Sequence, residues 1–164
     1  MNNRDTFLPR RTAQQPSGPP PPKLPPSLAG NPSLPYPAIG TELTELRLQI
    51  PGVQGSVLGG VDGLRIAHDL PAQFNPDDLA AMAAATFGLG RQVSLRLGQG
   101  DFRQSTVRNH GGYLAVYAVG PQALLSVVGT DAINVARLHL HTPPVAERLT
   151  KLLAQVSGGT DTTH

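Results

Sequence analysis

Three glycines lie close together between two apolar segments, and glycine-rich loops can hold a phosphate group. Gly59 and Gly60 come shortly before the pair Asp62-Gly63, which supplies the third glycine. A phosphate-binding loop, however, runs from a strand into a helix N-terminus and usually carries Lys-Ser or Lys-Thr, and no such pair follows any glycine here. Asp-Gly flanked by alternating apolar residues is typical of a β-hairpin. The sequence therefore predicts a turn at these glycines, without a nucleotide site.

Two further pairs of side chains carry groups that metal ions bind. His139 and His141 alternate, but at helical spacing their side chains point about 200° apart, which disfavours a shared zinc ion. Asp77 and Asp78 follow Asn75-Pro76, a combination of capping residue, proline and acidic residues that marks a helix start. We therefore predict no metal site at either pair.

No group of residues supplies a nucleophile together with a base. The chain has no cysteine, so it can form neither disulfides nor thiolate nucleophiles. No serine stands in a Gly-x-Ser-x-Gly turn. The sequence favours a non-catalytic binding protein, with no catalytic residues and no cofactor.

The elements that would position these residues follow from periodicity and from turn residues. A short helix is predicted over 41–50, with Thr41 as its cap and Pro51-Gly52 as its stop. The hairpin comes next, and a long helix over 76–97 starts after Asn75. Three strands are then expected, over 102–108, 113–119 and 123–128.

The last segment, 135–156, places apolar residues three and four positions apart, which indicates one helical face. Pro143-Pro144 lies inside it, and an interior proline removes a helix hydrogen bond. We expect either a kinked helix or two short helices on one line.

The predicted long helix has two contrasting faces. Its core stripe is expected to hold Leu79, Met82, Ala83, Thr86, Val93 and Leu97. Its other face is unusually small, with Ala80, Ala81, Ala84, Ala85 and Gly88. Small side chains allow another backbone to approach closely, which fits either packing on the sheet or contact with a second subunit or partner.

The strand predicted over 102–108 is mostly polar, which indicates a strand at the edge of the sheet. Such an edge presents unpaired amides and carbonyls. Pairing with its twin in a homodimer is one way to satisfy them.

Residues 1–40 differ from the rest of the chain, because they hold eleven of its 17 prolines. They carry four basic residues and one acidic residue, a net charge of +3, and the remainder has a net charge of −1. We expect a disordered Pro-rich basic tail over 1–40, a domain over 41–156 and a frayed end over 157–164. The tail could serve as a spacer, as a docking peptide for a proline-binding partner, or as an anchor to anionic surfaces.

Charge and hydropathy narrow the possible partners and locations. The predicted domain is nearly neutral, so its charge does not indicate nucleic-acid binding. No apolar run approaches the roughly 20 residues that span a bilayer, and residues 1–10 lack the apolar stretch of a signal peptide. We therefore expect a cytoplasmic protein without a membrane span.

Several short motifs occur in a recognisable order. They are Pro51-Gly52-Val53-x-Gly55, Asp62-Gly63-Leu64, the Ala-rich stretch from Leu79 to Ala85, Gly111-Gly112-Tyr113-Leu114 and the apolar strand over 123–128. In this order and spacing the chain resembles the Roadblock / dynein light chain family, in its bacterial branch, over about residues 41–156.

The resemblance implies an α+β fold with helices packed on a five-stranded antiparallel sheet. The implied order is helix, strand, strand, helix, three strands and helix. It also implies a homodimer in which the long helices lie side by side and the edge strands pair. The residues assigned to that edge are Phe102, Gln104, Thr106 and Arg108.

The bacterial members resemble partner proteins of small Ras-like GTPases, which they bind and whose nucleotide cycle they can modulate. On this basis we expect a partner surface along the long helix, around Ala80, Ala84, Phe87 and Arg91. Arg91 is either a cation that reaches the nucleotide or switch loops, or a solvated helix arginine. Two other functions stay open: a structural adaptor that acts through the Pro-rich tail without a GTPase, and a small-molecule sensor.

Overall fold

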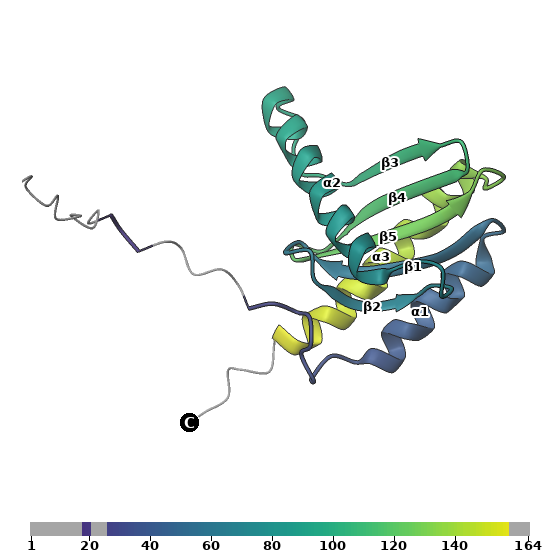
Figure 1. Cartoon of the computed structure of the whole chain (residues 1–164). Coiled ribbons are helices and arrows are strands. Elements are labelled where there is room, and N and C mark those ends of the chain that lie inside the picture. Colours follow the sequence, from purple (N-terminus) through teal and green to yellow (C-terminus); the bar gives the residue numbers. More distant parts are fainter. Residues whose placement is uncertain (1–17, 21–25, 158–164) are drawn as a thin grey trace, which may run out of the picture.

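The computed structural model describes residues 18–20 and 26–157. A five-stranded antiparallel sheet lies between one helix, α2, on one face and two helices, α1 and α3, on the other (Figure 1). The elements along the chain are α1 (Tyr36–Gln49), β1 (Val53–Gly60), β2 (Arg65–Asp69), α2 (Pro76–Leu97), β3 (Gln104–Asn109), β4 (Gly112–Val119), β5 (Ala123–Thr130) and α3 (Val135–Ser157). This order and the α+β class confirm the predicted fold.

The strands lie in the order β2-β1-β5-β4-β3, and all neighbours are antiparallel. The central pair joins β1 to β5, with Val57 opposite Ser126. Strand β3 pairs with β4 alone, with Ser105 opposite Val116. It is therefore an edge strand, as its polar sequence predicts.

Two apolar layers hold the helices to the sheet. The larger layer lies under α1 and α3, where side chains three, four or seven positions apart point inward: Ile39, Leu43, Leu46, Leu138, Val145 and Leu149 are all buried. The smaller layer lies under α2, where two clusters pack: Val57, Leu79 and Ala80, and then Ala83, Val116 and Leu124.

Helix α1 begins at Tyr36, so two expectations about this part of the chain are wrong. Thr41 is not the cap, because its hydroxyl donates to the carbonyl of Pro37 within the helix at 3.0 Å. Residues 36–40 belong to a helix and not to the tail, because buried Leu34 and Ile39 extend the apolar face and a proline is tolerated in a first turn. The tail residues 1–17 and 21–25 lie outside the described part.

Helix α2 has the predicted bounds. The side chain of Asn75 accepts hydrogen bonds from the amides of Asp77 and Asp78, at 2.9 and 3.4 Å. Gly98, at φ +63°, ends the helix in the left-handed conformation.

Helix α3 is a single helix that contains Pro143 and Pro144, so the alternative of two short helices is wrong. Its predicted apolar face is confirmed, and Leu138, Thr142, Val145 and Leu149 lie buried on it. The C-terminal residues 158–164 fall outside the described part. Within residues 18–20 and 26–157, no helix is long and apolar enough to cross a membrane.

Candidate functional site

Two residues of the predicted small face of α2, Ala80 and Ala84, lie on the glycine hairpin, whereas Ala81, Ala85 and Gly88 are exposed. A Cβ added at Gly59 would lie 3.2 Å from the Cβ of Ala80, and one at Gly63 would lie 3.6 Å from the Cβ of Ala84. The hairpin glycines therefore let the helix backbone come close to the sheet. They serve helix packing, which agrees with the predicted turn.

Three of the four residues expected on a partner surface are thus turned toward the sheet. Ala80 is 1% exposed, and Ala84 and Phe87 are half-buried. Arg91 alone is exposed, with its guanidinium 5.7 Å from the centre of the Phe87 ring. Of this set, Arg91 has the most surface left for a partner.

The opposite face of α2 carries a row of exposed apolar side chains. These residues, which we call the outer row, are Met82, Leu89, Val93 and Leu97, and each is between 47% and 68% exposed. The expectation that Met82, Val93 and Leu97 lie in the core is wrong, because Ala80 and Ala84 pack on the hairpin and turn these three side chains outward. The sequence signal for this row is that α2 is apolar on more than one side.

A groove of about 550 Å³ separates the outer row from β3. Its lining includes Leu89 and Val93 from α2, and Ser105 and Val107 from β3. Val107 is itself 41% exposed. An unpaired strand edge and an apolar helix face therefore lie side by side on the molecule.

The four predicted edge residues occupy different positions. Phe102 precedes the strand and packs edge-to-face on Phe87, with ring centres 5.3 Å apart. Gln104 and Thr106 turn to the α3 side, where both approach His139. Arg108 lies at the far end of β3, with its guanidinium 5.5 Å from the centre of the Tyr113 ring.

A polar cluster around His139 joins β3 and β4 to α3. The side-chain amide of Gln104 and the hydroxyl of Tyr117 lie 3.2 and 2.8 Å from Nδ1 of His139. A ring nitrogen has a single lone pair, so Nδ1 can accept from only one of them at a time. On the other side of the ring, the hydroxyl of Thr106 lies 3.4 Å from Nε2.

Burial raises the pKa of Tyr117 to about 12, which keeps its hydroxyl protonated as a donor. No group of three or more His, Asp or Glu side chains with metal-binding geometry occurs among the described residues. The cluster is thus a hydrogen-bond network that connects the edge strand to α3.

Comparisons with known proteins agree with this arrangement. Residues 39–130 match the family model of the Roadblock/LC7 domain. The uncharacterized protein MJ1340 of Methanocaldococcus jannaschii is 31% identical over 99 residues, which cover 60% of this chain and 85% of that protein.

Solved structures share the fold. The gliding protein MglB from Thermus thermophilus aligns with a TM-score of 0.67 at 22% identity, over 76% of this chain and 98% of that chain. A structure of MglB in a tetrameric arrangement aligns with a TM-score of 0.68 at 22% identity, over the same shares of the two chains. With its five-stranded sheet, its three helices and a family match over more than half of its length, the chain belongs to the Roadblock/LC7 domain family.

Proposed function

We propose that this protein is a non-catalytic, homodimeric regulator or scaffold that binds a small Ras-like GTPase and modulates its nucleotide cycle or its localisation. The observation that carries the proposal is an unpaired edge strand beside an apolar helix face in a Roadblock/LC7 domain. The bacterial branch that the sequence resembles consists of partner proteins of such GTPases.

The dimer is argued from the surface of α2 and β3. Monomers rarely expose a contiguous apolar row such as Met82, Leu89, Val93 and Leu97. A free strand edge also has to be blunted or paired. Two copies related by a two-fold axis would pair their β3 strands and cover both outer rows at once. The tetrameric arrangement of MglB is a precedent for assembly of this fold.

Substitution of the outer row tests the dimer. We expect Val93→Glu to halve the mass measured by sedimentation equilibrium, because the dimer would bury the new carboxylates. Leu48→Glu is the matched control, since Leu48 is an exposed leucine on α1, and it should leave the mass unchanged. A monomeric wild-type protein at micromolar concentration would contradict the dimer.

Affinity capture in two nucleotide states tests the GTPase partner. The full chain and a chain lacking residues 1–25 are used on native lysate with excess GDP or a non-hydrolysable GTP analogue. We expect both chains to retain a small GTPase preferentially in one state. If only the full chain retains a partner, and does so regardless of nucleotide, the adaptor function is favoured and the GTPase proposal is contradicted.

A further inference from the structure

Every second residue of the edge strand β3 turns its backbone groups toward solvent. The amide of Ala118 donates to the carbonyl of Arg103 at 2.9 Å, so Arg103 turns its backbone toward β4. This direction alternates along an antiparallel strand. The residues of β3 whose backbones point away from β4 are therefore Gln104, Thr106 and Arg108.

The side chains of these residues lie on the α3 side of the sheet. Gln104 and Thr106 approach His139 of α3. Arg108 is in phase with them, and its guanidinium lies over the ring of Tyr113 on the neighbouring strand. All of them are exposed. A strand added at this edge would place its own side chains beside them, because residues that face each other across two strands share one face of the sheet.

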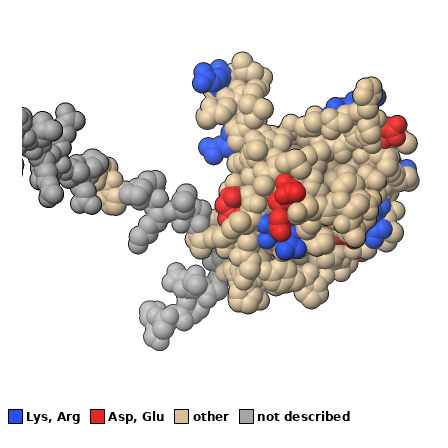
Figure 2. Space-filling model, in the orientation of Figure 1, with Lys and Arg blue, Asp and Glu red and all other residues tan. Residues whose placement is uncertain are grey.

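A second copy of this chain fits the surface around this edge. In Figure 2, most of the side chains where α2 and β3 lie are uncharged, so two copies can approach without strong repulsion. The outer row and its groove continue the surface on the α2 side. A two-fold axis brings the two edges together in antiparallel sense, as in every other strand pair of the sheet.

We propose that the two β3 strands pair around a two-fold axis at Thr106. In this register Thr106 faces the partner's Thr106, and Gln104 faces the partner's Arg108. On the α2 side, Ser105 faces the partner's Val107, so that this exposed valine is covered. The register rests on the homodimer proposed above, and it decides which residues of the two copies meet.

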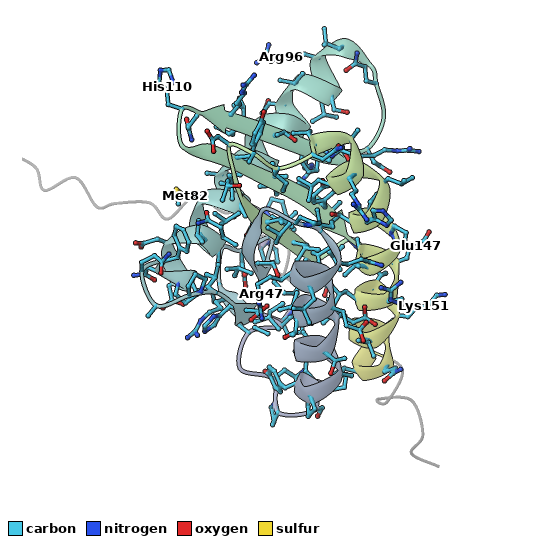
Figure 3. The ribbon with its side chains drawn as sticks, turned by 90° about the vertical axis from the view of Figure 1, so that its right-hand side faces the viewer. Arg47, Met82, Arg96, His110, Glu147 and Lys151 are labelled. Carbon is cyan, nitrogen blue, oxygen red and sulfur yellow. The ribbon has the colours of Figure 1, made fainter. Side chains whose placement is uncertain are left out.

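The neighbouring registers pair fewer of the outward backbones. If one strand slides by two residues in one direction, Arg108 faces the partner's Phe102, which precedes β3. In the other direction, Gln104 faces the partner's His110, and Figure 3 shows His110 in the turn beyond the strand. A further slide in that direction places Arg108 opposite the partner's Arg108, and like charges there are unfavourable. Only the axis at Thr106 pairs all the outward backbones within the strand.

The contact of Gln104 with the partner's Arg108 is specific to this register. Within one copy these residues are four positions apart along a strand, about 13 Å, so their side chains can meet only across the interface. The side-chain carbonyl of Gln104 can accept from the guanidinium of the partner's Arg108. A charge introduced at Gln104 should therefore change the affinity of the dimer through that arginine.

Single cysteines report the register, because the chain has no cysteine of its own. We expect Thr106→Cys to form a disulfide-linked dimer on oxidation, since facing residues of this kind have Cα atoms about 5.5 Å apart. Ser105→Cys and Val107→Cys face their own copies only in the two neighbouring registers, so both should stay unlinked. Leu48→Cys, at an exposed position on α1, is the control for random collision. Non-reducing electrophoresis measures the rates.

Charge substitutions test the contact itself. Gln104→Glu should lower the dimer dissociation constant about fivefold at low salt, with a smaller effect at high salt, because each copy gains an ion pair. Arg108→Gln should abolish that gain. Thr106→Glu should raise the constant about fivefold, because two carboxylates then face each other. Gln49→Glu, at an exposed residue of α1, is the control. No gain, or a gain that survives Arg108→Gln, would overturn the proposed register.

The register and the dimer can fail separately. A monomeric wild-type chain in sedimentation overturns both. If the chain is a dimer that Val93→Glu dissociates, but Ser105→Cys or Val107→Cys links faster than Thr106→Cys, the register alone is overturned. A dimer in which none of these cysteines links faster than Leu48→Cys overturns the pairing of the two β3 strands.

Discussion

Two glycines of α2, two positions apart, have opposite surroundings. Nothing lies within 4 Å of a Cβ added at Gly88, whereas a Cβ at Gly90 would overlap the ring of Phe102. Each glycine costs a helix roughly 1 kcal/mol relative to alanine. The cost at Gly90 is offset by the contact of Phe102 with the helix, and the cost at Gly88 has no such compensation.

We therefore expect Gly88→Ala to raise the free energy of unfolding by up to about 1 kcal/mol. Gly90→Ala should give no gain, or a loss, because the ring of Phe102 must move. Urea denaturation of both variants measures the difference. Equal stabilisation by the two substitutions would show that Phe102 does not depend on Gly90.

Tyr117 is expected to make stability sensitive to alkaline pH. Its pKa is raised from 10.0 to about 12 by burial, so the folded state holds the phenolic proton more tightly than the unfolded state. Its contribution is therefore complete below pH 10 and is lost as the pH rises through about 12. Denaturation curves between pH 9 and pH 12 measure this loss.

Tyr117→Phe should remove that part of the pH dependence and cost about 1 kcal/mol at neutral pH, because the hydrogen bond between Tyr117 and His139 is lost. Tyr113→Phe is the control and should keep the alkaline loss of stability. An unchanged pH profile in Tyr117→Phe would contradict the assignment.

At the scale of the elements, local signals could be predicted and the rotation of α2 could not. The bounds of α2 follow from Asn75, Pro76 and Gly98, whose effects act within one turn of the chain. The face of α2 that meets the sheet is set by its contact with the glycine hairpin, which is another segment of the chain. Because α2 carries apolar residues on several sides, the sequence does not indicate which side faces the sheet.

The difference between local signals and contacts with distant segments also explains why the start of α1 and the continuity of α3 could not be predicted. The segment around Tyr36 contains prolines, as the predicted tail does. Only the burial of Leu34 and Ile39 shows that this segment belongs to the domain. In α3 the apolar spacing continues across Pro143-Pro144, and packing of one face keeps a single helix. The groove between the outer row and β3 could not be predicted, because its walls come from α2, from the loop that follows α2 and from β3.

For the whole molecule, the position of the domain boundary decides how much of the N-terminus can be removed. Deletion of residues 1–25 removes no buried side chain that the structure describes. Deletion of residues 1–40 removes Leu34 and Ile39, which are 4% and 0% exposed. Loss of such side chains costs roughly 2–5 kcal/mol each.

We therefore expect the melting temperature of the chain without residues 1–25 to equal that of the full chain. The chain without residues 1–40 should melt at a clearly lower temperature or fail to fold. Calorimetry on the two truncations decides this, and equal melting temperatures for both would contradict the assignment of Leu34 and Ile39 to the core.

The order β2-β1-β5-β4-β3 also affects how the chain can fold during synthesis. The middle of the sheet joins β1 to β5, whose partners Val57 and Ser126 are 69 residues apart. Before β5 leaves the ribosome, the β1–β2 hairpin therefore lacks its main neighbour and exposes apolar side chains. Pairing across so long a stretch is slow, because the chain loses entropy before contacts are gained. Nascent chains that stop short of β5 should thus depend on chaperones, and those that include it should not.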